Sequence, residues 1–161
     1  MGAATIILYK RGDRYVQDGA GKDIAHGLVG ELSVHGICFE AMERMDGFVA
    51  LDGGQDYPNS SMYWHEKLDC YVVNPWHFKK AGGEHAQILI HKAGVPSDLK
   101  GCIAPGFFKN KILTQSGDTM NTIWEQCGGV PGVKTVKPPV IVTLSVEGNM
   151  RRLQDCKPYT G

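Results

Sequence analysis

The residues best suited to chemistry are a histidine and a cysteine near the middle of the chain. His91 ends an apolar run, residues 92–101 form a turn-rich segment, and Cys102 follows Gly101 directly. A free thiol has a pKa of about 8.5, so a cysteine nucleophile needs a base, which a nearby imidazole supplies. A glycine before the cysteine lets backbone N–H groups approach a substrate carbonyl and stabilise an oxyanion. The segment predicts Cys102 as nucleophile, His91 as base and Gly101 as part of the oxyanion site.

A structural role for the same residues stays open. A cysteine beside Ile103 is commonly a small buried hydrophobic residue, and a histidine at a strand end often makes an ordinary hydrogen bond. The spacing of His91 and Cys102 matches no general catalytic motif. The two roles differ in the expected reactivity of Cys102, which alkylates fast in the catalytic case and slowly in the buried one.

Three side chains outside this segment are candidates for substrate binding. Trp64 and Trp76 each precede a histidine and flank the predicted strand 70–74. Such clusters commonly pack within a hairpin, and the alternative is that they line a groove for a peptide or a glycan. His85 lies on the same face of a predicted strand as His91, because side chains alternate along a strand.

No metal or other cofactor is expected. His85, His91 and Cys102 are zinc-binding residue types, but six strand residues of about 3.3 Å each would separate the two histidines by about 20 Å. Residues 52–56 place acidic side chains beside glycines and lack the alternating ligands of a calcium loop. The sequence also lacks a glycine-rich phosphate loop that ends in Lys-Ser or Lys-Thr.

Strands are the main elements expected to position these residues. Alternation, β-branched content and flanking turns predict strands over Thr5–Lys10, Leu28–Val34, Ile37–Met42, Cys70–Asn74, His85–His91 and Val140–Val146. His35-Gly36 reads as the tight turn of a hairpin. In His85–His91, Ala86, Ile88 and Ile90 form the apolar face, and Leu89 is expected on the polar one.

One helix is expected, over roughly Thr119–Cys127, with Asp118 as N-cap and Gly128 as its stop. Residues 46–62 read as a long loop, residues 130–139 as a turn-rich connector, and residues 150–161 as a weakly ordered tail. The sum predicts a single mainly β domain over residues 1–161, a small sheet or barrel-like structure with one helix.

The overall composition excludes several classes of protein. The 161 residues carry 17 Lys and Arg against 17 Asp and Glu, so the chain lacks the basic character of a nucleic-acid binder. No stretch approaches the about 20 apolar residues of a membrane span, and no signal peptide is recognised. Five cysteines without CxxC spacing favour synthesis in the cytoplasm with reduced thiols, and export by a route that reads no signal stays open.

The segment around Cys102 resembles the signature of an uncharacterised family of bacterial and phage proteins, domain-of-unknown-function family 5675. Members carry Ile-His, a glycine, a short acidic or threonine-bearing loop, Gly-Cys-Ile and another glycine. The matching positions are Ile90, His91, Gly94, Asp98, Gly101, Cys102, Ile103 and Gly106. The upstream hairpin also fits, so the resemblance covers roughly residues 28–106. It implies a phage or mobile-element context.

The same segment is similar, more remotely, to the active-site signature of L,D-transpeptidases of the YkuD type. Those enzymes have an upstream histidine, then Ser/Thr-His-Gly-Cys and a following arginine, and their cysteine attacks a carbonyl of a peptidoglycan stem peptide. The resemblance implies that Cys102 is the nucleophile, His91 the base and Gly101 part of the oxyanion environment. Lys100 replaces the family's second histidine, and its charge would lower the thiol pKa. Ala104 replaces the arginine associated with recognition of a stem-peptide carboxylate.

The predicted function is therefore cysteine-dependent acyl transfer or hydrolysis on peptidoglycan peptide. The residues expected to contact substrate are Lys100, Asp98, His85, Trp64 and Trp76. The alternative is a non-catalytic accessory protein that binds a host or bacterial protein, with Cys102 structural, because similarity of fold does not establish activity. A third reading is an interaction module that uses the 46–62 loop and the tryptophan clusters, and it predicts that Cys102→Ala keeps full function.

Overall fold

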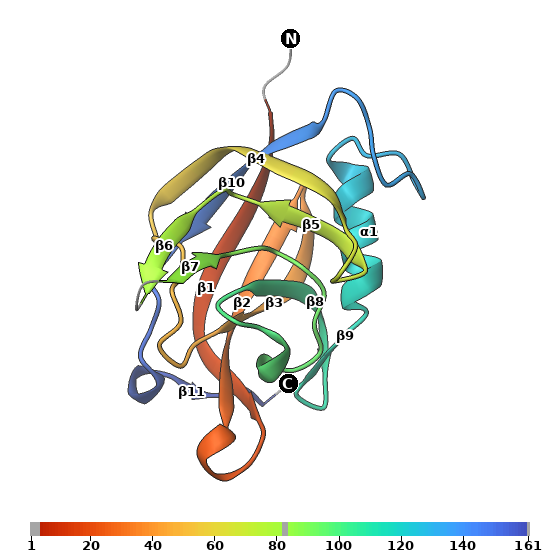
Figure 1. Ribbon diagram of the computed structural model, residues 1–161. Helices are drawn as coiled ribbons and strands as arrows, with labels where there is room; N and C mark the ends of the chain where they lie inside the picture. The colour runs from red at the N-terminus through yellow and green to blue at the C-terminus, as the bar shows by residue number, and fades with distance from the viewer. Residues whose placement is uncertain (1–3, 82–83, 161) are drawn as a thin grey trace.

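The protein is built mainly from strands, with one α-helix among the residues that the structure describes (Figure 1). The computed structural model describes residues 4–81 and 84–160, with the backbone alone for residues 78–81 and 84–87. The strands are β1 (Thr5–Asp18), β2 (Ala25–Val34), β3 (Ile37–Arg44), β4 (Gln55–His65), β5 (Cys70–Asn74), β6 (Phe78–Ala81), β7 (Glu84–Gln87), β8 (Ile103–Lys109), β9 (Ile112–Thr114), β10 (Val140–Glu147) and β11 (Lys157–Pro158), and the helix is α1 (Ser116–Gln126). Short 3₁₀ turns cover Gly21–Asp23, Pro96–Asp98 and Leu153–Asp155. The predicted mainly β class with one helix is confirmed.

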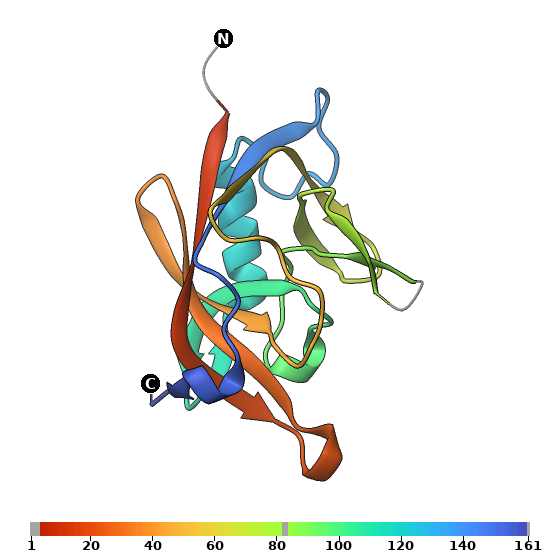
Figure 2. The ribbon, with the colours of Figure 1, turned by 90° about the vertical axis from the view of Figure 1, so that its left-hand side faces the viewer.

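One curled sheet forms the body of the molecule, in the order β5-β4-β10-β1-β2-β3-β8-β9. β1 runs parallel to β10 and β11, while β1–β2, β2–β3, β3–β8, β4–β5, β4–β10 and β8–β9 are antiparallel. β6 and β7 form a separate two-stranded hairpin. The sheet curls into a half-barrel, and α1 lies within its curve (Figure 2).

The hairpin predicted around His35-Gly36 is confirmed. β2 and β3 pair from Val34↔Ile37 at the turn to Gly27↔Arg44 at the far end. His35 and Gly36 have φ of 50° and 78°, and two successive positive φ values define the type I′ turn, whose twist suits a hairpin. The hairpin also supports the segment of interest, because β3 pairs with β8 directly after Cys102.

The main core fills the space between the concave face of the sheet and α1. Met120, Ile123 and Trp124 project from the helix into this core with the predicted helical spacing. The helix begins at Ser116, earlier than predicted, and Gln115, with φ of 57°, takes the capping position in place of Asp118. Asp118 lies in the first turn, where a negative charge interacts favourably with the helix dipole.

A buried ion pair fixes a loop to the strands beside the core. The Arg11 guanidinium donates to both carboxylate oxygens of Glu43 at 2.8 Å, and the Tyr9 hydroxyl donates to the same carboxylate at 2.7 Å. Arg11 also donates to the carbonyls of Leu51 and Gly148, at 2.7 and 2.9 Å. Removing one member of a buried pair typically costs about 3–5 kcal/mol, because the other charge stays desolvated. The pair thus stabilises the connection that precedes β4.

The single strand predicted over His85–His91 is wrong in its second half. β7 ends at Gln87, and Ile90 makes an isolated bridge to each neighbouring strand. Ile88, Leu89 and Ile90 are all buried, and Leu89 belongs to a second apolar cluster. The expected polar face is missing because this stretch passes between β5 and β8 with both of its sides covered.

The loop predicted over residues 46–62 is shorter than expected. β4 begins at Gln55 and pairs with β10, with a change of register between Val142 and Leu144. Pro58 and Asn59 lie opposite this irregularity, and Asn59 has φ of 62°. The turn-forming residues therefore produce a bulge within a strand, and they do not end it.

The tail predicted to be weakly ordered packs against the sheet. β11 pairs in parallel with β1, and the backbone N–H of Tyr159 donates to the Tyr15 carbonyl at 2.8 Å. The Tyr159 ring packs on Phe108, with centroids 5.0 Å apart, and its hydroxyl donates to Glu40. These contacts with β1, β3 and β8 give the tail a fixed place.

Candidate active site

The two arms of the curled sheet are joined through residues 89–91, with Ile90 at the centre. Its N–H and C=O exchange hydrogen bonds of 3.0 Å with Val73 of β5, and it forms a parallel bridge with Ile103 of β8. Around that bridge, His91 N–H donates to the Ile103 carbonyl at 2.9 Å, and Ile103 N–H donates to the Leu89 carbonyl at 3.0 Å. We call the junction of Val73, Ile90 and Ile103 the seam.

The seam brings the predicted nucleophile and base to the same side of the backbone. Ile90 and Ile103 point into the main core, so their chain neighbours point the opposite way. Cys102 packs there in the second apolar cluster, together with Leu89. His91 lines a pocket on that side, whose wall includes Leu113 of the second cluster.

His91 is held as a neutral imidazole. Its side chain is buried, and Nδ1 donates to the Lys92 carbonyl at 2.8 Å, which leaves Nε2 as the acceptor nitrogen. Burial lowers the pKa of His91, and the nearby His65 acts in the same direction, while the Lys92 carbonyl and the Asp98 carboxylate oppose them. A neutral imidazole with a fixed tautomer is the form that accepts a proton.

Cys102 is a buried thiol. Its exposed fraction is 8%, and burial raises the pKa of the thiol above its ordinary value. The Glu43 carboxylate raises the pKa further, whereas backbone hydrogen bonds from Leu89 and Lys100 lower it. The resting state is therefore the protonated thiol, and nucleophilic attack would require a base at the moment of reaction.

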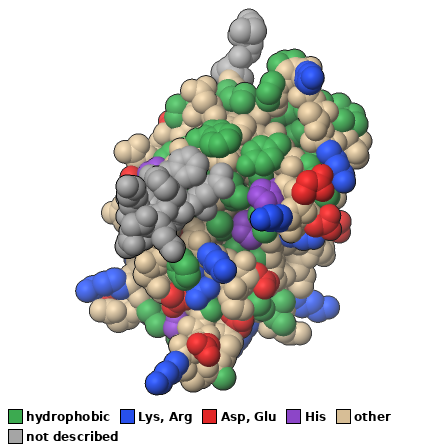
Figure 3. All heavy atoms as spheres, viewed as in Figure 1, with side chains coloured by type: hydrophobic (Ala, Val, Ile, Leu, Met, Phe, Trp, Pro, Cys, Tyr) green, Lys and Arg blue, Asp and Glu red, His purple; other side chains and the backbone are tan. Residues whose placement is uncertain are grey.

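A pocket of about 470 Å³ opens beside His91. Its lining mixes charged, polar and apolar side chains, including Lys67, Leu68, His91, Lys92, Asp98, Leu113 and Ser116. Ser116 Oγ accepts from Ala93 N–H at 3.1 Å, and Asp98 Oδ2 accepts from Gly94 N–H at 3.0 Å, so the wall is pinned by hydrogen bonds. Histidine, lysine and acidic side chains gather on this face of the molecule (Figure 3).

Two residues beside Cys102 are placed away from the pocket lining. Gly101 has φ of 86°, and a Cβ there would come within 2.9 Å of the Val49 carbonyl oxygen. A glycine is therefore needed for backbone conformation and close packing, whatever its role towards an oxyanion. Lys100 is exposed. Within the predicted segment, His91 and Asp98 line the pocket and Cys102 and Lys100 do not.

The two tryptophans do not share a groove. Trp64 packs against the main core on one face of β4. Trp76 follows β5, is 54% exposed, and its Nε1 donates at 3.0 Å to Ser61 Oγ, on the opposite face of β4. His85 lies in β7, and its side chain falls outside the described residues.

The structure adds residues that the sequence patterns did not assign to this site. Lys67 and Leu68 come from the β4–β5 turn, Ser116 from the start of α1, and His65 pairs across the hairpin with Cys70. Recognition of the β4–β5 pairing in the sequence would have placed Lys67 and Leu68 in the turn of a hairpin. The pairing was hidden because residues 55–62 read as a loop.

Comparison of the chain with models of known families, with curated proteins and with solved structures returned no match. The two resemblances drawn from the sequence therefore stay predictions. In the described part of the chain, no helix is long and apolar enough to cross a membrane. The same residues contain no group of three or more His, Cys, Asp or Glu side chains placed to hold a metal ion.

Proposed function

We propose that the protein is a cysteine-dependent acyl-transfer enzyme that acts on peptidoglycan peptide, with Cys102 as nucleophile and His91 as base. The observation that carries the proposal is His91 itself. It is a buried neutral imidazole with a fixed tautomer, on the same side of the seam as Cys102, and it borders a pocket. A buried neutral histidine that borders a polar pocket suits general-base catalysis better than it suits packing alone.

The proposed reaction starts from two uncharged groups. Nε2 of His91 takes the S–H proton while Sγ of Cys102 bonds to the substrate carbonyl carbon, which gives a tetrahedral oxyanion. The C–N bond then breaks, and the imidazolium returns its proton to the leaving amine. A thioester on Cys102 remains. Water or a second amine attacks this thioester while His91 accepts its proton, the C–S bond breaks, and the thiolate recovers the proton.

The substrate class rests on the resemblance to L,D-transpeptidases and on the character of the pocket. Peptides of the cell wall carry both ammonium and carboxylate groups. The pocket offers Asp98 to the first and Lys67 and Lys92 to the second. These lysines supply a positive charge that can take the place of the arginine that the family has at the position of Ala104.

The direct test is capture of the thioester. Purified protein would be mixed with soluble muropeptides, quenched in acid and weighed as intact protein, and the adduct would be mapped by peptide digestion. We expect an acyl adduct on Cys102 that is lost in Cys102→Ser. General-base catalysis is worth about 10²–10⁴-fold, so His91→Gln should slow acylation by at least about 10²-fold.

Cys38→Ser is the matched control, because Cys38 is an exposed thiol elsewhere on the surface. It should keep the adduct unchanged. Circular dichroism of each variant would establish folding. Folded wild-type protein that forms no adduct with any muropeptide, or an adduct that survives Cys102→Ser, overturns the proposal.

A non-catalytic role is the second candidate, and the burial of Cys102 favours it. A thiol with a raised pKa inside an apolar cluster is also what a purely structural cysteine looks like. In that case Cys102 alkylates slowly at neutral pH, and its rate is unchanged by His91→Gln. Partner binding would then persist in Cys102→Ala.

A further inference from the structure

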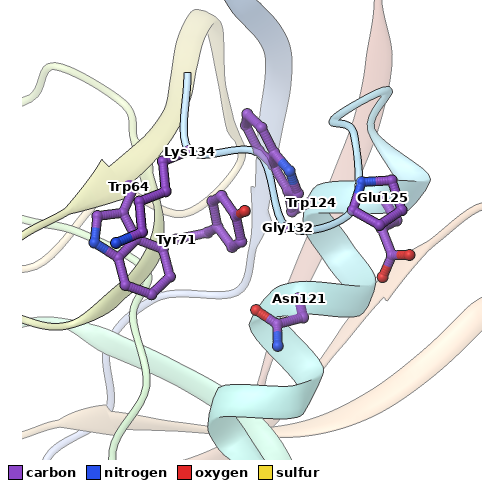
Figure 4. A pocket seen from close by; sticks show the side chains of 8 residues that line it. Trp64, Tyr71, Asn121, Trp124, Glu125, Gly132 and Lys134 are labelled. Atoms are coloured by element: carbon purple, nitrogen blue, oxygen red, sulfur yellow. The ribbon is translucent and has the colours of Figure 1, made fainter. Parts of the chain in front are cut away.

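A second pocket, of about 410 Å³, lies between the β4–β5 hairpin and the C-terminal half of α1 (Figure 4). Three aromatic rings form much of its lining, those of Trp64, Tyr71 and Trp124. Asn121, Glu125 and Lys134 supply polar groups around them. Of these residues only Trp64 was singled out by the sequence, because the others are spread over three separate elements.

The aromatic rings are fixed before any ligand arrives. Tyr71 stacks on Trp124 with centroids 4.4 Å apart and planes 10° apart, and Trp64 meets Tyr71 edge-on at 5.1 Å. The Tyr71 hydroxyl and the Trp124 Nε1 each donate at 2.9 Å to carbonyls of Val133 and Val130. These bonds also tie the 130–134 loop to the pocket, so its walls are preorganised.

The indole N–H of Trp64 is not satisfied by any described residue of the protein. Its Nε1 is buried and has no hydrogen-bond acceptor among the described residues. The Lys134 ammonium lies 4.5 Å from the centre of its ring. Buried donors are nearly always paired, so this indole N–H is an exception among the described residues.

The chemistry of the lining fits a neutral polyhydroxyl ligand. Lys134 and Glu125 have opposite charges, so the rim favours neither an anion nor a cation overall. Lys134 already occupies the cation position over Trp64 and would repel a second cation. Tyr71 and Trp124 are only 3% and 1% exposed, so Trp64 is the ring that a ligand can reach. A pyranose has an apolar C–H face that can pack on Trp64 beside Lys134, and its hydroxyls can pair with amide, carboxylate and ammonium groups.

The two pockets are separate, and α1 contributes residues to the lining of both. Ser116 and Gly117 of α1 line the His91 pocket, and Asn121 and Glu125 line the aromatic pocket. At 1.5 Å per residue, these positions are about 6–14 Å apart along the helix axis. A saccharide with a short attached peptide can span that distance.

We propose that the aromatic pocket is a saccharide-binding subsite, which holds a neutral sugar of the glycan while the attached peptide enters the His91 pocket. The second half of this statement rests on the proposed function. The saccharide site itself does not, since it depends only on the lining of the aromatic pocket.

The test is calorimetric titration with a neutral N-acetylglucosamine trimer, with Cys102→Ser as the host protein so that no chemistry interferes. We expect saturable binding that becomes at least about tenfold weaker in Asn121→Ala and in Trp64→Phe. Gln126→Ala is the matched control, because Gln126 is exposed on the same helix and does not line the pocket. It should leave the affinity unchanged.

Absence of saturable binding by the folded protein overturns the subsite. Equal affinity in Asn121→Ala, Trp64→Phe and Gln126→Ala does the same, since the sugar would then bind elsewhere. Saturable binding of tetramethylammonium, weakened by Trp64→Phe and without any trimer binding, would make the pocket a cation site and would also overturn the proposal. If the trimer binds but the wild type forms no thioester on Cys102 with muropeptides, the proposed enzymatic function is wrong and the saccharide subsite is supported.

Discussion

His91 and Cys102 are both held in their uncharged forms by burial, which acts on them in opposite directions. Burial disfavours the imidazolium and so lowers the pKa of His91, and it disfavours the thiolate and so raises the pKa of Cys102. A preformed thiolate–imidazolium pair is therefore unfavourable in the resting protein. Under the proposed function, the proton is therefore transferred during attack, when a bound substrate has displaced water from the pocket.

The lowered pKa of His91 predicts a pH dependence of stability. In the unfolded chain, His91 becomes protonated as the pH falls below its ordinary pKa of about 6.5. In the folded chain, protonation of His91 requires a lower pH. The contribution of neutral His91 to the free energy of unfolding is complete above pH 6.5, and it is lost as the pH falls towards the folded pKa. Urea unfolding at pH 7.5 and pH 5.5 should show a larger loss of unfolding free energy on acidification in the wild type than in His91→Gln.

The exposed His35 supplies the control for that measurement, because His35→Gln removes an imidazole from the surface turn. Its loss on acidification should match the wild type. If His91→Gln and His35→Gln lose the same free energy, burial does not control the titration of His91.

Residue types along one segment selected His91 and Cys102 as the candidate base and nucleophile, and their pairing stays a prediction. His91 and Cys102 are close in sequence, and the seam supports both of them. The rest of the pocket could not be predicted in this way. Lys67 and Ser116 reach it from the β4–β5 turn and from the start of α1, and only tertiary packing brings these together.

Elements with an unambiguous turn were predictable, and elements with an internal irregularity were not. The β2–β3 hairpin follows from His35-Gly36 and the flanking apolar runs, because the turn fixes the register. β4 contains Pro58 and Asn59, which are turn formers by type, so its bulge reads as the end of a strand. The β4–β5 hairpin and both pockets beside it were missed for this reason.

The turn at His35 predicts a stabilising substitution. A non-glycine residue with φ of 50° is strained, and asparagine tolerates this region best in a type I′ turn. His35→Asn should raise the free energy of unfolding by about 0.5–1 kcal/mol in a urea titration. His35→Val should lower it, because a β-branched residue fits poorly at positive φ. Equal stability of the two variants would show that the turn does not constrain the fold.

The molecule as a whole is an open sheet whose arms meet through Ile90, and the candidate site lies at that meeting point. Long-range contacts of this kind order a site without a ligand, because both arms must move for it to open. The buried Arg11–Glu43 pair supports the same region, since Glu43 pairs with Ile103 in the β3–β8 ladder. The two candidate side chains and their rigid support therefore share one part of the fold.

The seam should accordingly open only when the whole protein unfolds. The N–H groups of Ile90 and His91 donate across it, at 3.0 and 2.9 Å, and their hydrogen exchange should be within about tenfold of that of Leu32 in the β1–β2 ladder. Asp23 N–H, in an exposed 3₁₀ turn, should exchange rapidly under the same conditions. Exchange followed by NMR at pH 7 would give each rate separately. Seam amides that exchange at least about 10²-fold faster than Leu32 would mean that the arms separate on their own, and that the backbone on which His91 and Cys102 lie is not fixed in the free protein.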